Sequence, residues 1–107
     1  MANEPLKGHL DLMLLQILAS GPAHGYQVIE ALRQRSDGAF DLPEGTVYPA
    51  LHRLERTGAL TSSWDGSTGR RRRIYQLTPR GRGELRTARS EWQRFSTGVF
   101  AVLGATA

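Results

Sequence analysis

The chain has no cysteine, which excludes disulfide bonds, thiolate metal ligands and cysteine nucleophiles and fits a reducing cytoplasm. It also has no long hydrophobic run. The longest run, Val99 to Leu103, is far shorter than the roughly 20 apolar residues that a membrane-spanning helix needs, and no secretory signal pattern opens the chain. With 107 residues, the sequence therefore predicts one small cytoplasmic domain.

Lysine is scarce too, because all but one of the 14 basic residues are arginine. The net charge is only +4, but nine arginines fall between residues 70 and 94, opposed there by just two acids, Glu84 and Glu91. Cations gathered on one surface release the counterions of phosphates, and arginine binds a phosphate through a planar fork of donors. This uneven charge indicates a nucleic-acid partner.

Hydrophobic periodicity and turn residues predict four helices and one hairpin. A helix that is apolar nearly all round follows a polar arm at residues 1–7, and a long last helix is capped by Thr78 with proline at its first position. The second helix is expected to turn Tyr26, Val28, Ile29 and Leu32 inward. The helices are expected at residues 8–19, 25–35, 43–57 and 79–103, and the strands at residues 59–64 and 71–77.

This order of elements is that of a winged helix-turn-helix, mostly α with a small β-hairpin. Residues 1–78 would form the DNA-binding domain, and residues 79–107 a long C-terminal dimerisation helix. The second helix of a helix-turn-helix lies in the major groove, so the helix at residues 43–57 is the expected reader of DNA.

The helix at residues 43–57 has two distinct faces. We expect DNA contacts from its polar face, where the hydroxyls of Thr46 and Tyr48 can bind phosphates or base edges and Pro49 can meet a thymine methyl. His52 and Arg53 follow on the same face. The alternative is that Tyr48 and His52 pack within the domain and that Arg53 or Arg56 pairs with Glu55 or Glu44. The opposite, buried stripe consists of Val47, Ala50, Leu51 and Leu54.

Two further segments carry candidate phosphate contacts. Gly25 and Tyr26 open a helix, where free N–H groups and the helix dipole favour an anion, although Tyr26 can instead be a core aromatic. Arg70, Arg71 and Arg72 belong to a run of four adjacent cations, which repel one another unless an anion neutralises them. We predict phosphate or minor-groove contacts for these three; the alternative is a solvated hairpin tip. The fourth arginine alternates to the other side and is expected to lie against the sheet.

The last helix carries a second signal. Six of its apolar residues follow a strict 3-4-3-4-3 spacing, which is typical of the seam of a helix pair. A monomer of this size has little core left to cover such a row, so we expect a homodimer interface, with Leu10, Met13 and Leu14 of the first helix as its other wall. The six seam residues are Leu85, Ala88, Trp92, Phe95, Val99 and Val102.

Four motifs distributed along nearly the whole chain carry a family resemblance. They are Ser20-Gly21-Pro22 after the leucine-rich first helix, His24-Gly25-Tyr26, Gly45-Thr46-Val47-Tyr48-Pro49-Ala50-Leu51, and Gly69-Arg70-Arg71-Arg72-Arg73-Ile74-Tyr75-Gln76-Leu77-Thr78. Together they resemble the PadR family of bacterial transcription regulators, in its short form with a single helix after the wing. The resemblance implies a homodimeric repressor whose C-terminal helices help to form the dimer. Such a dimer is expected to bind double-stranded DNA at an inverted-repeat operator.

Trp92 lies on the predicted seam and has two interpretations. It is either a packing residue of the dimer or the flat aromatic wall of a pocket for a planar effector between the subunits. The resemblance to drug-sensing short PadR proteins suggests the second interpretation. Leu12, Phe95 and Ser96 would then be the neighbours of Trp92 in that pocket.

Two other function classes compete with a DNA-binding repressor. A winged helix can serve as a protein-interaction module without sequence-specific DNA binding, since a fold does not settle a function. An enzyme is not expected, because His9, His24 and His52 have no metal-ligand spacing and the chain has no glycine-rich phosphate loop or Ser/His/Asp arrangement. The sequence thus predicts no cofactor and no metal ion.

Overall fold

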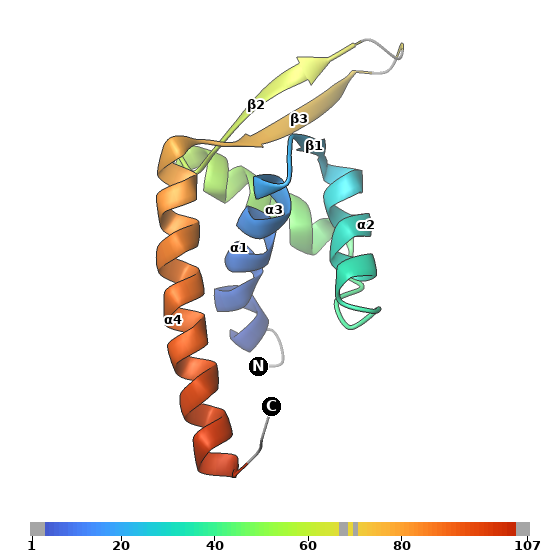
Figure 1. Ribbon diagram of the computed structural model, residues 1–107. Helices are drawn as coiled ribbons and strands as arrows, with labels where there is room; N and C mark the ends of the chain where they lie inside the picture. The colour runs from blue at the N-terminus through green and yellow to red at the C-terminus, as the bar shows by residue number, and fades with distance from the viewer. Residues whose placement is uncertain (1–3, 67–68, 70, 105–107) are drawn as a thin grey trace.

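Four helices and a small three-stranded antiparallel sheet make up the computed structural model, which describes residues 4–66, 69 and 71–104 (Figure 1). The arrangement is a winged helix with a long C-terminal helix, so the predicted fold class is confirmed. The strands lie in the order β1-β3-β2 in the sheet. The elements are α1 (Glu4–Ala19), β1 (Ala23–His24), α2 (Gly25–Arg35), α3 (Glu44–Arg56), β2 (Leu60–Asp65), β3 (Arg72–Leu77) and α4 (Pro79–Leu103).

Two local features differ from the expectation. α1 begins at Glu4, so the last residues of the predicted polar arm are helical. β1 is a strand of two residues that the sequence did not predict, in which Ala23 pairs with Tyr75 and His24 with Ile74 of β3. A strand this short carries no periodic pattern, so only its backbone partners on β3 define it.

The core lies between α1, α2, α3 and the sheet, and α4 packs along α1. α2 and α3 each bury one face because their leucine and valine side chains recur at helical spacing, whereas α1 buries more than one side. Tyr75 and Leu77 of β3 close the core on the side of the sheet. The buried apolar residues are Leu10, Leu14, Leu15, Ile17, Leu18, Val28, Leu32, Val47, Ala50, Leu51, Leu54, Ala59, Leu60, Tyr75, Leu77 and Leu85.

The junction between the wing and α4 is fixed by side-chain and backbone contacts. Thr78 is the predicted N-cap: its hydroxyl accepts from the Gly81 N–H at 3.0 Å and donates to the Gly58 carbonyl at 2.6 Å. Glycine is required at position 81, because a Cβ there would collide with the carbonyl of Ala59. α4 therefore starts directly at the end of β3, with no linker between them.

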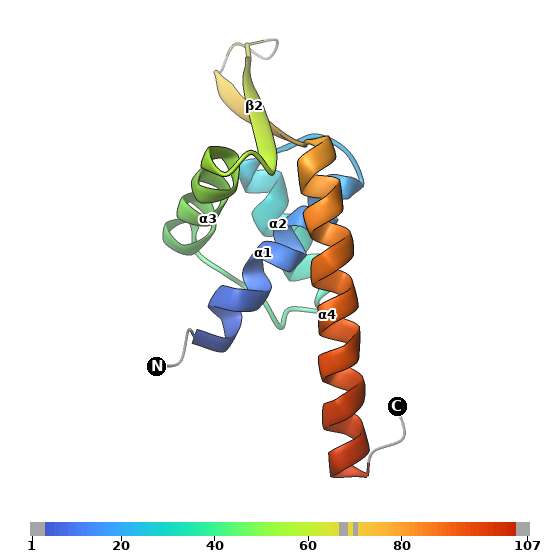
Figure 2. The same cartoon turned by 90° about the vertical axis from the view of Figure 1, so that its left-hand side faces the viewer.

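The C-terminal half of α4 extends beyond the rest of the molecule (Figures 1 and 2). This projection makes the molecule long in one direction, with extents of 54 × 28 × 25 Å. Within the described ranges, no helix is both long enough and apolar enough to cross a membrane.

Candidate nucleic-acid interface

α3 presents a polar face away from the core. Its four predicted stripe residues are buried, Pro49 and His52 are exposed, and Thr46 and Tyr48 are half-buried. The predicted orientation of this helix is therefore confirmed. The contacts of these residues with DNA stay a prediction.

The ring of Tyr48 lies directly over Gly25 at the start of α2. A Cβ added at Gly25 would lie 2.5 Å from carbons of that ring, so only glycine allows the two helices this contact. Burial, and secondarily the nearby Glu44 carboxylate, raises the pKa of the Tyr48 phenol further above neutral pH, where a phenol is protonated and can donate a hydrogen bond. The His52 ring lies 6.4 Å from Tyr48 and 6.5 Å from Tyr75. Tyr48 and His52 thus lie beside aromatic rings of their own domain. The alternative, in which both pack within the domain, holds only in part, because His52 is exposed.

Tyr26, the next residue of α2, is 60% exposed. Its predicted inward position is wrong. Val28 and Leu32 are four residues apart and share the buried face, whereas Tyr26 lies two residues before Val28 and points elsewhere. Tyr26 is accordingly available to a ligand beside the N-terminus of α2.

The wing is formed by β2 and β3, and Arg73 lies against it as expected. It does not point away from Arg71, however, because both arginines contact the ring of Trp64. The Arg73 Nε donates to the Ser62 hydroxyl at 2.8 Å, and its Nη2 lies 3.5 Å from Glu55 Oε2 of α3. The Ser62 hydroxyl donates in turn to the same carboxylate. This small network ties the wing to the last turns of α3.

Trp64 also belongs to this surface, and it was not among the predicted contacts. It is 54% exposed and stands opposite Arg73 in the β2–β3 register. The guanidinium carbons of Arg71 and Arg73 lie 4.7 and 5.1 Å from the centroid of the indole. Arg71 and Arg72 are exposed, whereas Arg70 falls outside the described residues. Residues directly opposite each other in a strand pair point to the same side of the sheet. Trp64 could therefore have been placed beside Arg73 only with knowledge of the register between β2 and β3.

His24 links the wing to α2. Its Nδ1 accepts from the Gln27 N–H at 3.4 Å as part of a capping box, and its Nε2 lies 3.1 Å from Arg72 Nη1. A neutral imidazole has only one accepting nitrogen. Each tautomer of His24 can therefore accept from only one of the two donors, the Gln27 N–H or Arg72 Nη1. Burial, and then the charge of Arg72, lowers the pKa of His24, with Asp65 acting in the opposite direction. The neutral ring is therefore the favoured form at this junction.

Arg53 is engaged within the chain. Its guanidinium forms an ion pair with Asp11 of α1, and both side chains are partly exposed. The alternative predicted for Arg53, an ion pair with Glu44 or Glu55 of its own helix, is wrong, because the acid that it binds is Asp11 of α1. Sequence spacing could not find this partner, which is 42 positions away.

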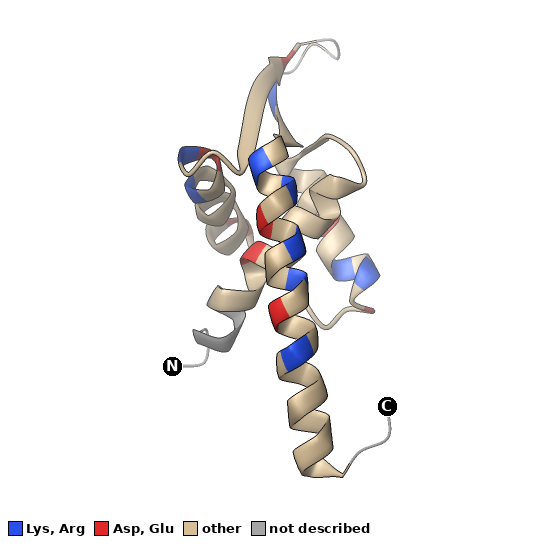
Figure 3. Cartoon of the chain, turned by 60° about the vertical axis from the view of Figure 1, so that its left-hand side comes forward, with Lys and Arg blue, Asp and Glu red and all other residues tan. Residues whose placement is uncertain are grey.

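A cavity of about 560 Å³ lies between the N-terminus of α2, the polar face of α3 and the inner side of the wing. We call the surface that lines this cavity the concave face. Of the predicted DNA contacts, Thr46, Pro49 and Arg53 do not line it. Cations continue from the wing along the N-terminal part of α4, while the C-terminal end of α4 carries none (Figure 3). The concave face is lined by His24, Gly25, Tyr26, Tyr48, His52, Trp64, Arg71, Arg72, Arg73 and Tyr75.

Residues 14–87 match the family model described as the transcriptional regulator PadR-like family. The chain belongs to this family. The transcriptional regulator Rv3488 of Mycobacterium tuberculosis is 38% identical over 74 residues, which cover 69% of this chain and 66% of that protein. The solved structure of a transcriptional regulator from Clostridium thermocellum has a TM-score of 0.83 at 28% identity, covering 90% of this chain and 94% of that one. A PadR family regulator from Clostridium difficile has a TM-score of 0.77 at 32% identity, covering 91% and 99%.

PadR-like proteins are DNA-binding transcriptional regulators and not enzymes, and this chain shares that function class. In the described part of the chain, no three His, Asp or Glu side chains gather in a way that could hold a metal ion.

The predicted seam of this PadR-like chain divides into two parts. Leu10 and Leu14 of α1 and Leu85 of α4 are buried in the core of their own subunit, which leaves little of their surface for a partner. Their contact with a partner stays a prediction. The apolar pattern of α1 runs nearly all round, and two of its sides are used inside the subunit. Met13 and Ala88 are half-buried. The rest of the row is exposed on the projecting half of α4: Trp92, Phe95, Val99 and Val102, accompanied by Phe100 and Leu103.

Two cavities flank α1 where α4 passes it. A small one of about 260 Å³ brings together Leu12, Trp92 and Phe95 with His9, whose ring meets the indole edge to face at 4.8 Å. Ser96 does not line this cavity; its hydroxyl donates to the Gln93 carbonyl at 3.2 Å.

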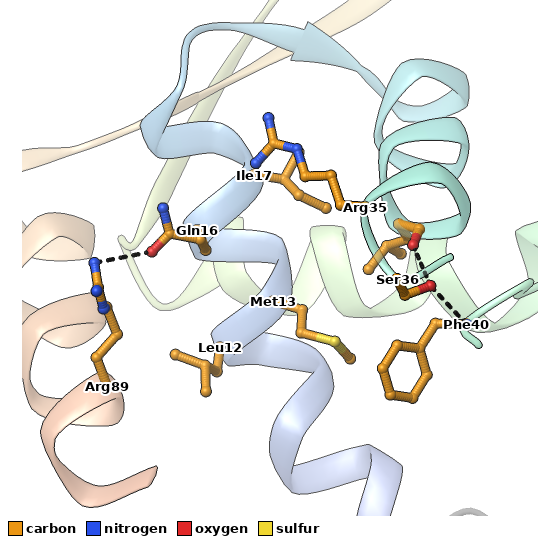
Figure 4. A pocket seen from close by; sticks show the side chains of 9 residues that line it. Leu12, Met13, Gln16, Ile17, Arg35, Ser36, Phe40 and Arg89 are labelled. Atoms are coloured by element: carbon orange, nitrogen blue, oxygen red, sulfur yellow. Dashed lines mark hydrogen bonds between the residues drawn. The ribbon is translucent and has the colours of Figure 1, made fainter. Parts of the chain in front are cut away.

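The larger cavity, of about 500 Å³, lies between α1, the end of α2 and the segment that follows it (Figure 4). Leu12, Met13 and Phe40 form much of its apolar wall. Two arginines stand at its edges, hydrogen-bonded to uncharged groups: Arg89 donates to Gln16 Oε1 at 3.3 Å and Arg35 to the Ser20 hydroxyl at 3.2 Å.

Proposed function

We propose that this PadR-like regulator is a repressor that binds an inverted-repeat operator as a homodimer. The observation that supports it is the concave face, where three elements distant in sequence place polar, aromatic and cationic groups side by side. Residues 1–78 would be the DNA-binding part, with the N-terminal residues of α3 in the major groove and the wing arginines on flanking phosphates. Repression would follow from occlusion of a promoter.

The second part of the proposal, dimerisation through residues 79–107, rests on the exposed apolar row of α4. Monomeric proteins rarely expose a contiguous apolar patch of this kind. Trp92 is 41% exposed, Phe95 60% and Val102 87%, all on the projecting half of one helix. A twofold pairing of two such helices would cover both copies of the row at once.

The third part is an effector. A planar aromatic molecule would lie against Trp92 and Phe95 in the small cavity beside Leu12, with the second subunit completing the site. Binding there would change how the two α4 helices meet, and with it the separation of the two DNA-binding parts. Ser96 does not line the cavity of its own subunit, so in this proposal the Ser96 of the second subunit would contact the ligand.

The decisive experiment is selection of bound duplexes from a random pool at a fixed, stated salt concentration. We expect a palindrome whose half-sites lie about 10 bp apart, or a multiple of that distance, because two recognition helices then face major grooves on one side of the DNA. Selection should be repeated with candidate aromatic compounds, which are expected to release the duplex.

A pool without enrichment, combined with no salt dependence of binding, would favour the competing function, a winged-helix protein-interaction module. For the DNA-binding function, log K should fall by about 0.9 per neutralised phosphate for each log unit of salt.

A further inference from the structure

Trp64 has a position that neither packing nor the fold requires. It lies near the tip of β2, is 54% exposed, and contributes nothing to the buried core. The wing is held by the backbone pairing of β2 and β3 from Leu60↔Leu77 to Asp65↔Arg72. A large aromatic residue at an exposed wing position therefore needs another explanation.

The contacts of the indole provide one, since two guanidinium groups converge on it. Arg73 lies directly across the strand pair at 5.1 Å from the ring centroid, and Arg71 lies one step along the same side at 4.7 Å. The electron-rich face of an indole attracts a cation. Trp64 thus helps to hold both guanidinium groups at this part of the wing.

The two arginines differ in what else they bind. Arg73 uses its Nε on the Ser62 hydroxyl and has its charge balanced by Glu55. Arg71 contacts the indole and forms no ion pair with any of the described residues. A cation–π contact does not require the N–H groups of a guanidinium to donate to an acceptor, whereas an ion pair would occupy them. Arg71 is thus both held in place and able to donate.

We propose that Trp64 is a positioning residue, which holds the Arg71 guanidinium by its face so that its N–H donors meet a phosphate of duplex DNA. This inference rests on the proposed DNA binding by the wing. It assigns Trp64 no base contact of its own: the indole acts through Arg71. Holding the long arginine side chain before the encounter removes part of the conformational entropy that binding would otherwise have to overcome.

The test measures the affinity of the full-length protein for a labelled mixed-sequence duplex of about three helical turns (~30 bp), over a series of salt concentrations. Trp64→Leu keeps an apolar side chain in the strand but removes the π-face. We expect two- to fivefold weaker binding, the range that corresponds to an exposed cation–π contact. The salt slope should fall by up to about 0.9, the value of one phosphate contact. Trp64→Tyr, which restores an aromatic face, should recover most of the affinity.

Coupling distinguishes a positioning role from a structural one. If Trp64 acts through Arg71, the double variant Trp64→Leu/Arg71→Ala should bind as Arg71→Ala does alone. The matched control is Ser63→Ala, which changes the neighbouring exposed residue on the other side of β2 and should bind as the wild type.

The outcomes separate cleanly. Wild-type affinity and slope in Trp64→Leu would overturn the inference, and so would losses that add in full in the double variant. Failure of the wild-type protein to bind any duplex would instead refute the proposed function itself.

Discussion

The two tryptophans of this chain are about equally exposed and lie in opposite chemical surroundings. Trp64, on the wing, is flanked by two arginines, whereas Trp92, on α4, contacts the rings of His9 and Phe95. An indole that contacts arginine side chains suits a polyanion, and an indole in an apolar row suits another apolar surface. Exposure alone therefore does not identify a binding surface; the neighbours of the exposed residue do.

The largest effect in this comparison is expected from Trp92→Asp. It would place a carboxylate in the proposed seam twice per dimer, and removing each charge from water costs several kcal/mol. We expect dimerisation to weaken by at least about a thousandfold, since 1.4 kcal/mol corresponds to a factor of ten. Sedimentation velocity over a concentration series would measure it. Ser90→Asp, with the same charge on the other side of the same turn, should stay dimeric, and a dimeric Trp92→Asp would refute the seam.

Next in size is the removal of the wing cations by Arg71→Ala combined with Arg72→Ala. Each lost phosphate contact should weaken binding to every duplex by about tenfold, because a hydrogen bond to a charged group contributes roughly 1.5 kcal/mol. The salt slope should drop by about 0.9 per contact. Titration of a labelled duplex by anisotropy would test this, with Arg94→Ala on the projecting half of α4 as the control. An unchanged slope would remove the wing from the interface.

A smaller effect is expected from Gly25→Ala. The added methyl group would lie 2.5 Å from the Tyr48 ring, so the ring must move although no charge or donor is lost. We expect stability to fall by about 1–3 kcal/mol, as for other overpacked sites, and operator affinity to fall with the displaced hydroxyl. Denaturant unfolding and operator titration would measure the two effects.

Gly83→Ala is the matched control for this variant, because its new methyl group would meet only the end of Arg86 at an ordinary 3.7 Å. If Gly25→Ala kept both wild-type stability and wild-type affinity, the contact between α2 and α3 would have no role in binding.

The smallest effect concerns pH. The pKa of His24 is lowered in the folded protein, chiefly by burial, so the folded state prefers the neutral ring. The stability from this preference is present above the unfolded pKa of about 6.5 and is lost as pH falls from there through the lower folded pKa. His24→Asn retains a capping side chain without the titration. Thermal unfolding between about pH 7.5 and pH 5 should therefore show a smaller loss in the variant, and equal losses would contradict the account.

Local chemistry made much of the fold predictable. Thr78-Pro79 marks the start of α4 because a hydroxyl cap and a proline at the first helical position are both specific signals. The bounds of α2 and the polar face of α3 followed from periodicity in the same way. The fold class depended on these signals together and was therefore recoverable.

What escaped prediction depends on contacts across the chain. α1 is apolar nearly all round, so its sequence could not tell that Leu10 and Leu14 face the core of their own subunit. The pairing of Trp64 with Arg73 requires the wing register, and the bond between Arg53 and Asp11 requires the crossing of α1 and α3. Of the two predictions for Tyr26, the core position failed for a simpler reason: its angle on the helix differs from that of Val28 and Leu32.

The rigid joint at Thr78 has a mechanical consequence. Since α4 follows the wing without a linker, and the Thr78 hydroxyl binds the Gly58 carbonyl at that corner, we expect α4 and the wing to rotate together. A small tilt of the C-terminal end of α4 would then displace the arginines of the wing relative to the DNA.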